Sequence, residues 1–108
     1  MNQAVYDELV AGILEILTSS VNKIILYGSV ARGTNTDDSD VDIALLMKGK
    51  LDAKTEDKLS DFIVEMNLKY DRVFSVIDID IELYQRWMHV LPFYANVERE
   101  GIVLWKAA

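Results

Sequence analysis

Two short apolar runs, separated by a turn-rich segment, constrain the fold of this chain more than any other feature. Residues 23–27, Lys-Ile-Ile-Leu-Tyr, and residues 41–47, Val-Asp-Ile-Ala-Leu-Leu-Met, each predict a buried strand. The segment between them, Gly-Ser-Val-Ala-Arg-Gly-Thr-Asn-Thr-Asp-Asp-Ser-Asp, consists mostly of turn formers, with room for one helical turn over 29–32. The sequence therefore predicts two buried strands joined by an exposed connection.

Helical periodicity surrounds these strands. Apolar side chains recur at helical spacing over residues 52–70, and Asp52 is suited to cap that helix. Pro92 separates two helices because it cannot continue the first one. The remaining predicted elements are helices over 3–18, 81–90 and 93–100 and strands over 73–79 and 102–105. This order predicts an α/β (α+β) fold with helices packed on a small mixed β-sheet, as a single domain over 1–108.

Charge and composition exclude several classes of function. The net charge of −7 argues against a surface that binds nucleic acid through its phosphates. The absence of cysteine excludes disulfide frameworks, Cys-based zinc sites and iron–sulfur clusters, and a single histidine argues against a Ser-His-Asp triad. The sequence shows neither a basic leader nor an apolar run long enough for a bilayer, which predicts a cytoplasmic protein without membrane contact.

The residues after the first strand are suited to bind phosphate. Gly28 lets the backbone turn tightly at the end of the strand and lets a ligand come close. If Ser29 opens a helical turn, its hydroxyl and the free backbone N–H groups form an anion site. Such a site suits the phosphates of a nucleotide.

Two aspartates open the second strand. Asp40 and Asp42 lie two positions apart, so their side chains leave the same face of the strand. Two neighbouring carboxylates repel each other unless a cation lies between them. Hard oxygen ligands suit Mg²⁺, which also takes substrate phosphates as ligands. The pair therefore predicts a metal clamp beside the phosphate site.

The whole pattern, Gly-Ser followed by ten residues and then Asp-x-Asp, resembles the signature of the DNA polymerase β-like nucleotidyltransferase superfamily. The fuller form, with Ala-Arg-Gly at 31–33 and Ser-Asp-Val-Asp at 39–42, is similar to the minimal nucleotidyltransferases (MNT). These are stand-alone catalytic domains, often paired with a small helical HEPN protein as toxin–antitoxin modules. The order of elements and the segment 96–101 also resemble that group, so the resemblance extends over the whole chain.

The resemblance implies a reaction and a partner. Asp40 and Asp42 would hold Mg²⁺, as two ions, together with ATP, whose outer phosphates Ser29 would bind. An acceptor hydroxyl would attack the α-phosphorus, and pyrophosphate would leave. The acceptor that the resemblance implies is a tyrosine of a HEPN-type toxin, so AMP would pass from ATP to a partner protein.

The third carboxylate of such a site has several candidates. The family fold places it on the strand that faces the aspartate pair, which is 73–79 in this sequence. Asp78 is the candidate catalytic and metal-binding residue because it lies within the strand, and Asp80 is an alternative of the same parity. In another register Ser75 takes this place, and no third carboxylate exists.

Two further assignments have alternatives. Arg32 either contacts phosphate, since its guanidinium matches phosphate oxygens, or pairs with Asp37 or Asp38. Four aromatic residues near the C-terminus are predicted to lie in the core, with a partner-binding patch or a surface for base stacking as the alternatives: Trp87, Phe93, Tyr94 and Trp105.

Three functions fit the sequence. The first is a Mg²⁺-dependent nucleotidyltransferase that modifies a partner protein. The second is a non-catalytic antitoxin that neutralises its partner by forming a complex; the unresolved third acid favours it, and the retained Asp40 and Asp42 oppose it. The third, ranked last, is a small-molecule transferase that acts as a homodimer.

Overall fold

Four strands form a mixed β-sheet at the centre of the molecule, which the computed structural model describes over residues 2–108. The strands are β1 (Val21–Tyr27), β2 (Val41–Met47), β3 (Phe74–Asp80) and β4 (Ile102–Lys106), in the spatial order β3-β2-β1-β4. The strand β1 pairs antiparallel with β2 and β4, and β2 pairs parallel with β3. The helices are α1 (Gln3–Leu17), α2 (Gly28–Arg32), α3 (Ala53–Tyr70), α4 (Ile81–Trp87) and α5 (Pro92–Glu100), and a 3₁₀ turn, η1, spans Thr18–Ser20. The predicted α/β fold with a small mixed sheet is confirmed.

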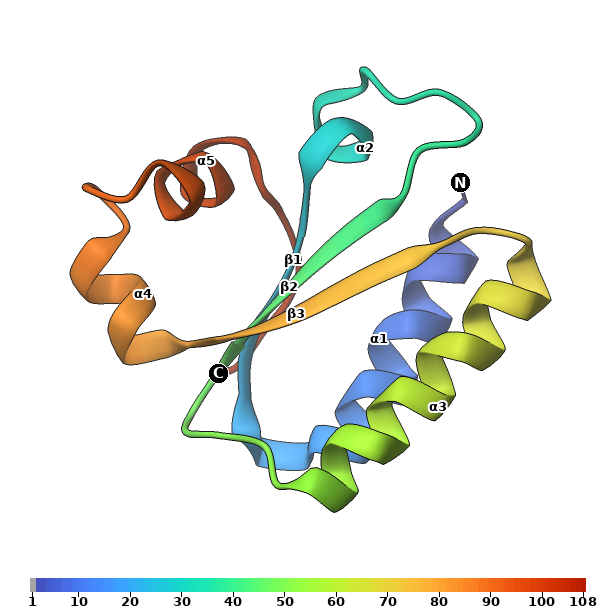
Figure 1. Cartoon of the computed structure of the whole chain (residues 1–108), viewed down its shortest axis with the longest axis horizontal. Coiled ribbons are helices and arrows are strands. Elements are labelled where there is room, and N and C mark those ends of the chain that lie inside the picture. Colours follow the sequence, from blue (N-terminus) through green and yellow to red (C-terminus); the bar gives the residue numbers. More distant parts are fainter. Residues whose placement is uncertain (1) are drawn as a thin grey trace.

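Each face of the sheet is covered by two helices (Figure 1). Helices α1 and α3 pack on one face, and α4 and α5 pack on the other. Side chains alternate between the two faces along each strand, so the side chains on both faces need to be apolar. The face toward α1 and α3 contains Ile24, Leu26, Ile43, Leu45 and Phe74. The face toward α4 and α5 contains Ile25, Ala44, Leu46 and Ile79. Burial on both sides explains why β2 is apolar almost without interruption.

The long helices form where their sequences supply caps and an apolar stripe. The Asn2 side chain accepts a hydrogen bond of 3.2 Å from the backbone N–H of Val5 at the start of α1. The Asp52 carboxylate accepts one of 2.7 Å from Thr55 N–H, which confirms the predicted cap of α3. Residues of α1 at every fourth position are buried against the sheet: Val5, Leu9, Ile13 and Leu17.

Some predicted boundaries differ from the structure. The first strand begins at Val21 rather than residue 23, because Val21 already pairs with Met47 of β2. Helix α4 ends at Trp87 rather than residue 90, where the N–H groups of Val90 and Leu91 both donate to the Trp87 carbonyl at 2.9 Å. That tight turn ends the helix before Pro92, which is the first residue of α5.

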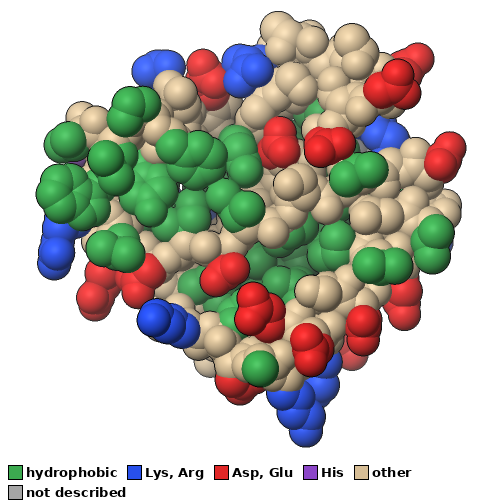
Figure 2. Space-filling model, viewed as in Figure 1, with side chains coloured by type: hydrophobic (Ala, Val, Ile, Leu, Met, Phe, Trp, Pro, Cys, Tyr) green, Lys and Arg blue, Asp and Glu red, His purple; other side chains and the backbone are tan. Residues whose placement is uncertain are grey.

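An apolar patch covers α4, α5 and the turn between them (Figure 2). Its exposed members are Leu83, Trp87, Val90, Leu91 and Phe93. The core prediction is therefore wrong for Trp87 and Phe93, which are 40% and 43% exposed, whereas Tyr94 and Trp105 are partly buried against the two cores.

Over residues 2–108, no helix has both the length and the apolar character needed to cross a bilayer.

Candidate active site at the junction of β1, α2 and β2

Gly28 follows β1 directly as the first residue of α2, against an aspartate of the neighbouring strand. Tyr27, the last residue of β1, pairs with Asp42, the second residue of β2. The backbone of Gly28 has a positive φ of 76°, and a Cβ at this position would collide with the Asp42 carboxylate. Glycine is therefore required here both for conformation and for space. The predicted tight turn at Gly28 agrees with this geometry, and the close approach of a ligand stays a prediction.

Ser29 lies in the first turn of α2, as the sequence predicts. Within residues 2–108, no side chain caps the N-terminus of this helix. The chain leaves α2 through Gly33, in the left-handed conformation, and the Thr34 N–H donates to the Ser29 carbonyl at 3.0 Å. This short turn leaves the first N–H groups of α2 without a side-chain partner beside Asp42.

Asp40 and Asp42 lie close enough to interact through their charges. Asp42 is half-buried and Asp40 is exposed. Burial raises the pKa of Asp42, the Asp40 carboxylate raises it further, and the Arg32 guanidinium opposes the shift. Burial and the Asp42 charge also raise the pKa of Tyr27. The junction is thus short of positive charge, which is the condition under which a cation binds well.

The prediction that Asp78 joins this pair is wrong. The parallel register places Ser75 opposite Asp42 and Asp78 opposite Leu45. Because side chains alternate along a strand, Asp78 faces the α3 side, where it lines a pocket with Phe74 and Val76. The register with Ser75 beside Asp42, which the sequence left as an alternative, is the one that forms.

Asp80 does not supply a third carboxylate either. It pairs with Met47 at the far end of β2 and shares the face of Asp78. Its carboxylate accepts hydrogen bonds from the N–H groups of Glu82, at 2.8 Å, and Leu83, at 3.4 Å, and so caps α4. In the part of the chain that the structure describes, no three His, Cys, Asp or Glu side chains form a metal-binding cluster.

Arg32 pairs with neither Asp37 nor Asp38 but with a residue that the sequence analysis missed. Its Nη1 lies 3.2 Å from Oε2 of Glu100, at the end of α5. The two residues border a cavity of about 190 Å³ beside Gly28, whose wall also includes Tyr27 and Phe93. The rings of Tyr27 and Phe93 meet edge to face, 5.6 Å apart. No local signal marks a pair 68 residues apart, so the sequence could not reveal it.

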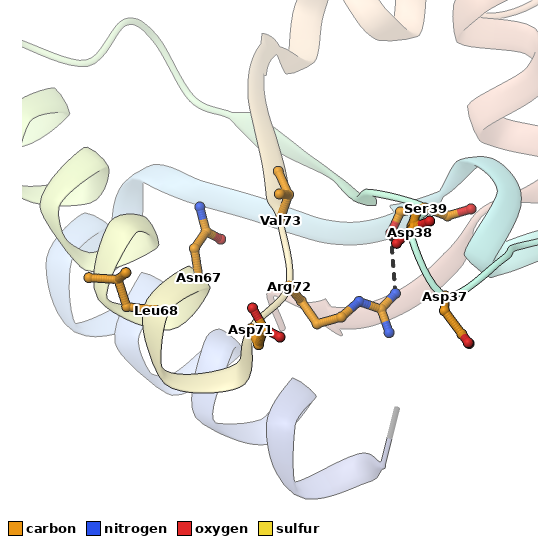
Figure 3. Close-up of a pocket in the computed structure, with 8 residues that line it drawn as sticks. All are labelled: Asp37, Asp38, Ser39, Asn67, Leu68, Asp71, Arg72 and Val73. Carbon is orange, nitrogen blue, oxygen red and sulfur yellow. Dashed lines mark hydrogen bonds between the residues drawn. The ribbon is translucent and has the colours of Figure 1, made fainter.

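A second arginine holds the segment that leads into Asp40 (Figure 3). Nη2 of Arg72 donates to the Ser39 carbonyl at 3.3 Å, across a pocket of about 490 Å³ lined by Asp37, Asp38 and Asn67 among others. Arg72 comes from the turn between α3 and β3 and is partly buried. It therefore ties the connection before β2 to the turn between α3 and β3.

Most of the chain matches a known family. Residues 12–107 match the family described as Polymerase beta, Nucleotidyltransferase, and the chain belongs to this family. The Gly-Ser motif at 28–29 and the two aspartates at 40 and 42 all fall within the matched region.

Two curated proteins of Methanocaldococcus jannaschii, each named for protein adenylyltransferase activity, are similar in sequence. One is 39% identical over 79% of this chain and 79% of its own length, and the other is 34% identical over 91% of this chain and 93% of its own. Among solved structures, an MNT antitoxin complex with a tri-AMPylated HEPN toxin from Shewanella oneidensis aligns with a TM-score of 0.56. That alignment covers 99% of this chain and 74% of the solved chain at 20% identity, which shows a shared fold.

Proposed function

We propose that residues 1–108 form one nucleotidyltransferase domain that transfers AMP from ATP to a hydroxyl group of a partner protein. The observation that carries this proposal is the junction of Gly28 and Ser29 with Asp40 and Asp42, in a chain of the Polymerase beta family. Nucleotidyltransferases of this family generally use a nucleoside triphosphate and a divalent metal ion. The names of the two archaeal relatives support a protein as the acceptor.

The donor set at the junction fits Mg²⁺. Asp40 and Asp42 offer hard carboxylate oxygens, and burial together with mutual repulsion raises the pKa of Asp42 when no cation offsets the charge. A Cβ at Gly28 would lie against the Asp42 carboxylate, so glycine at this position leaves room for a ligand beside that carboxylate. When bound, the ion would neutralise charge on the phosphate oxygens and orient them for displacement.

The other residues of the junction have separate roles in this proposal. The Ser29 hydroxyl and the first N–H groups of α2 bind the outer phosphates of ATP. Arg32 adds a positive charge near them. It can turn toward the phosphates because breaking its exposed pair with Glu100 costs little free energy. The acceptor oxygen forms a bond to the α-phosphorus, the bond to pyrophosphate breaks, and the acceptor proton passes to solvent. Asp40 and Asp42 would hold the metal ion by their charge, and neither forms a covalent bond to the substrate.

We further propose that the partner is a HEPN-type protein, as in the similar Shewanella complex. The apolar patch of α4 and α5, which includes Leu83, Val90 and Phe93, gathers exposed apolar side chains on one part of the surface and suits contact with a protein. A charge of −7 makes direct binding of nucleic acid unfavourable. A cytoplasmic location fits this chemistry, because nucleoside triphosphates are abundant there.

A second candidate function is a non-catalytic antitoxin that neutralises its partner by covering it. The observation that favours it is Ser75, which stands opposite Asp42 where a third carboxylate would have to lie. In that case the partner complex would form without any transfer of AMP.

Intact-mass spectrometry separates the two functions. The chain is co-expressed with its HEPN-type partner, purified, and incubated with Mg²⁺ and ATP. We expect an AMP-sized gain on the partner with the native chain and with Asp78→Asn, whose carboxylate lies on the other face, but none with Asp42→Asn. A stable complex without any mass gain would support the non-catalytic function instead.

A further inference from the structure

The register of β3 leaves the metal site with two carboxylates. Ser75 lies opposite Asp42 on the same face of the sheet, about 5 Å away in the strand-to-strand direction. On its other side Asp42 pairs with Tyr27. Both neighbours of Asp42 therefore carry a hydroxyl rather than a carboxylate.

Within residues 2–108, no other acidic side chain is placed to compensate. Asp78 faces the α3 side, and Asp80 caps α4. Glu100 is paired with Arg32 and also lies 3.5 Å from Arg99. The acids of the connecting loop, Asp37 and Asp38, line the pocket that Arg72 borders.

The negative charge of two carboxylates limits how many divalent ions they can hold. Two divalent ions in one phosphoryl-transfer site lie roughly 4 Å apart and repel each other strongly. Ligands with negative charge must offset that repulsion, and a single Mg²⁺ commonly uses one or two carboxylates together with substrate phosphates. The pair Asp40 and Asp42 is therefore a complete protein contribution for one ion and an incomplete one for two.

We propose that this chain holds a single divalent ion with its nucleotide, between Asp40 and Asp42. A second ion would need a carboxylate at position 75, where this chain has a serine. The inference rests on the proposed function, because it concerns the same site. It assigns to Ser75 a role in setting the number of ions: replacing this hydroxyl by a carboxylate completes a second site.

Counting bound Mn²⁺ tests the proposal without measuring activity. Mn²⁺ is titrated into the chain with saturating AMP-PNP, and free Mn²⁺ is read by electron paramagnetic resonance. We expect one ion per chain for the native protein and for Ser75→Ala, and two for Ser75→Asp. Asp78→Asn is the matched control, because it alters a carboxylate on the same strand but on the other face, and it should leave the count at one.

Thermal unfolding gives a second readout for Ser75→Asp. A third carboxylate beside Asp42 adds repulsion, so the metal-free variant should unfold at a lower temperature than the native chain. Saturating Mn²⁺ should raise its unfolding temperature by more than it raises that of the native chain.

The outcomes separate this inference from the proposed function. Two ions on the native chain, or a folded Ser75→Asp variant that still holds one, would overturn the inference while leaving the nucleotide site in place. No binding of Mn²⁺ with AMP-PNP by the native chain would overturn both.

Discussion

Gly28 meets two independent constraints, and a comparison with Gly33 separates them. Both glycines have a positive φ, 76° and 75° respectively, which side chains other than glycine rarely adopt. A Cβ at Gly33 would meet nothing within 4 Å, whereas one at Gly28 would collide with the Asp42 carboxylate. A side chain at either position would therefore strain the backbone, and a side chain at Gly28 would in addition collide with Asp42.

Alanine at these two positions should give different losses of function. We expect Gly28→Ala and Gly33→Ala each to lower the free energy of unfolding by about 1 kcal/mol or more, from the left-handed backbone alone. Only Gly28→Ala should also weaken binding of Mg²⁺ and AMP-PNP, by tenfold or more, because it displaces Asp42. Urea denaturation and calorimetric titration measure the two effects. Equal loss of binding in both variants would rule out the close approach at Gly28 as a functional feature.

Asp42 should make the metal-free protein less stable as the pH rises. Its pKa is raised in the folded state, first by burial and then by Asp40, so the folded chain keeps the proton to a higher pH than the unfolded chain. The free energy of unfolding therefore falls as the pH rises from about 4, the ordinary range of an aspartate, through the raised pKa. Above that window the full cost of the charge remains.

Asp42→Asn removes this cost and provides the test. In EDTA, the variant should be more stable than the native chain at pH 7, and the difference should vanish at pH 3. Added Mg²⁺ should stabilise the native chain at pH 7 and leave the variant unchanged. Urea denaturation at the two pH values measures this, with Asp78→Asn as the control for losing a carboxylate elsewhere on the surface. A variant that is less stable than the native chain at pH 7 in EDTA would contradict the account.

At the scale of elements, α2 and α5 meet through one ion pair that the sequence did not reveal. Arg32 ends α2 and Glu100 ends α5, with 3.2 Å between their charged atoms. Both side chains keep contact with solvent, so the pair contributes less than about 1 kcal/mol to stability. Arg32 is thus free to change partner when phosphate is present.

Changing each partner separately tests that role. Arg32→Ala should weaken binding of AMP-PNP with Mg²⁺ about tenfold, the effect of losing one charged hydrogen bond. Glu100→Gln should leave the affinity unchanged or higher, because it releases Arg32 from its pair. Calorimetric titration of both variants gives the answer. Similar losses in the two variants would mean that the pair acts by holding α2 against α5 rather than by contacting phosphate.

The third strand shows why its register could not be predicted from sequence. Ser75 and Asp78 lie an odd number of positions apart, so they face opposite sides of the sheet in any regular strand. A strand with one apolar face would reveal its orientation by alternation, but β3 is apolar on both sides because helices cover both. The register of the pairing between β2 and β3 fixes which side chain stands beside Asp42.

At the scale of the whole molecule, the sequence predicts features that depend on neighbouring residues, but it does not predict contacts between distant segments. The turn at Gly28, the cap at Asp52 and the strand over 41–47 each depend on neighbouring residues, and the structure contains all three. The contact of Arg72 with the Ser39 carbonyl joins segments 33 residues apart, so no local pattern predicts it. The exposure of Trp87 likewise depends on how α4 packs, not on its own sequence.

The central claim is that nucleotide and metal bind where β1, α2 and β2 meet. A crystal of the chain grown with Mn²⁺ and AMP-PNP tests it most directly, because Mn²⁺ is located by its anomalous scattering. The account predicts a Mn²⁺ peak bound by Asp40 and Asp42, with the outer phosphates against Ser29 and the start of α2. A nucleotide bound elsewhere, in the pocket beside Arg72 or in the groove that contains Asp78, would contradict it.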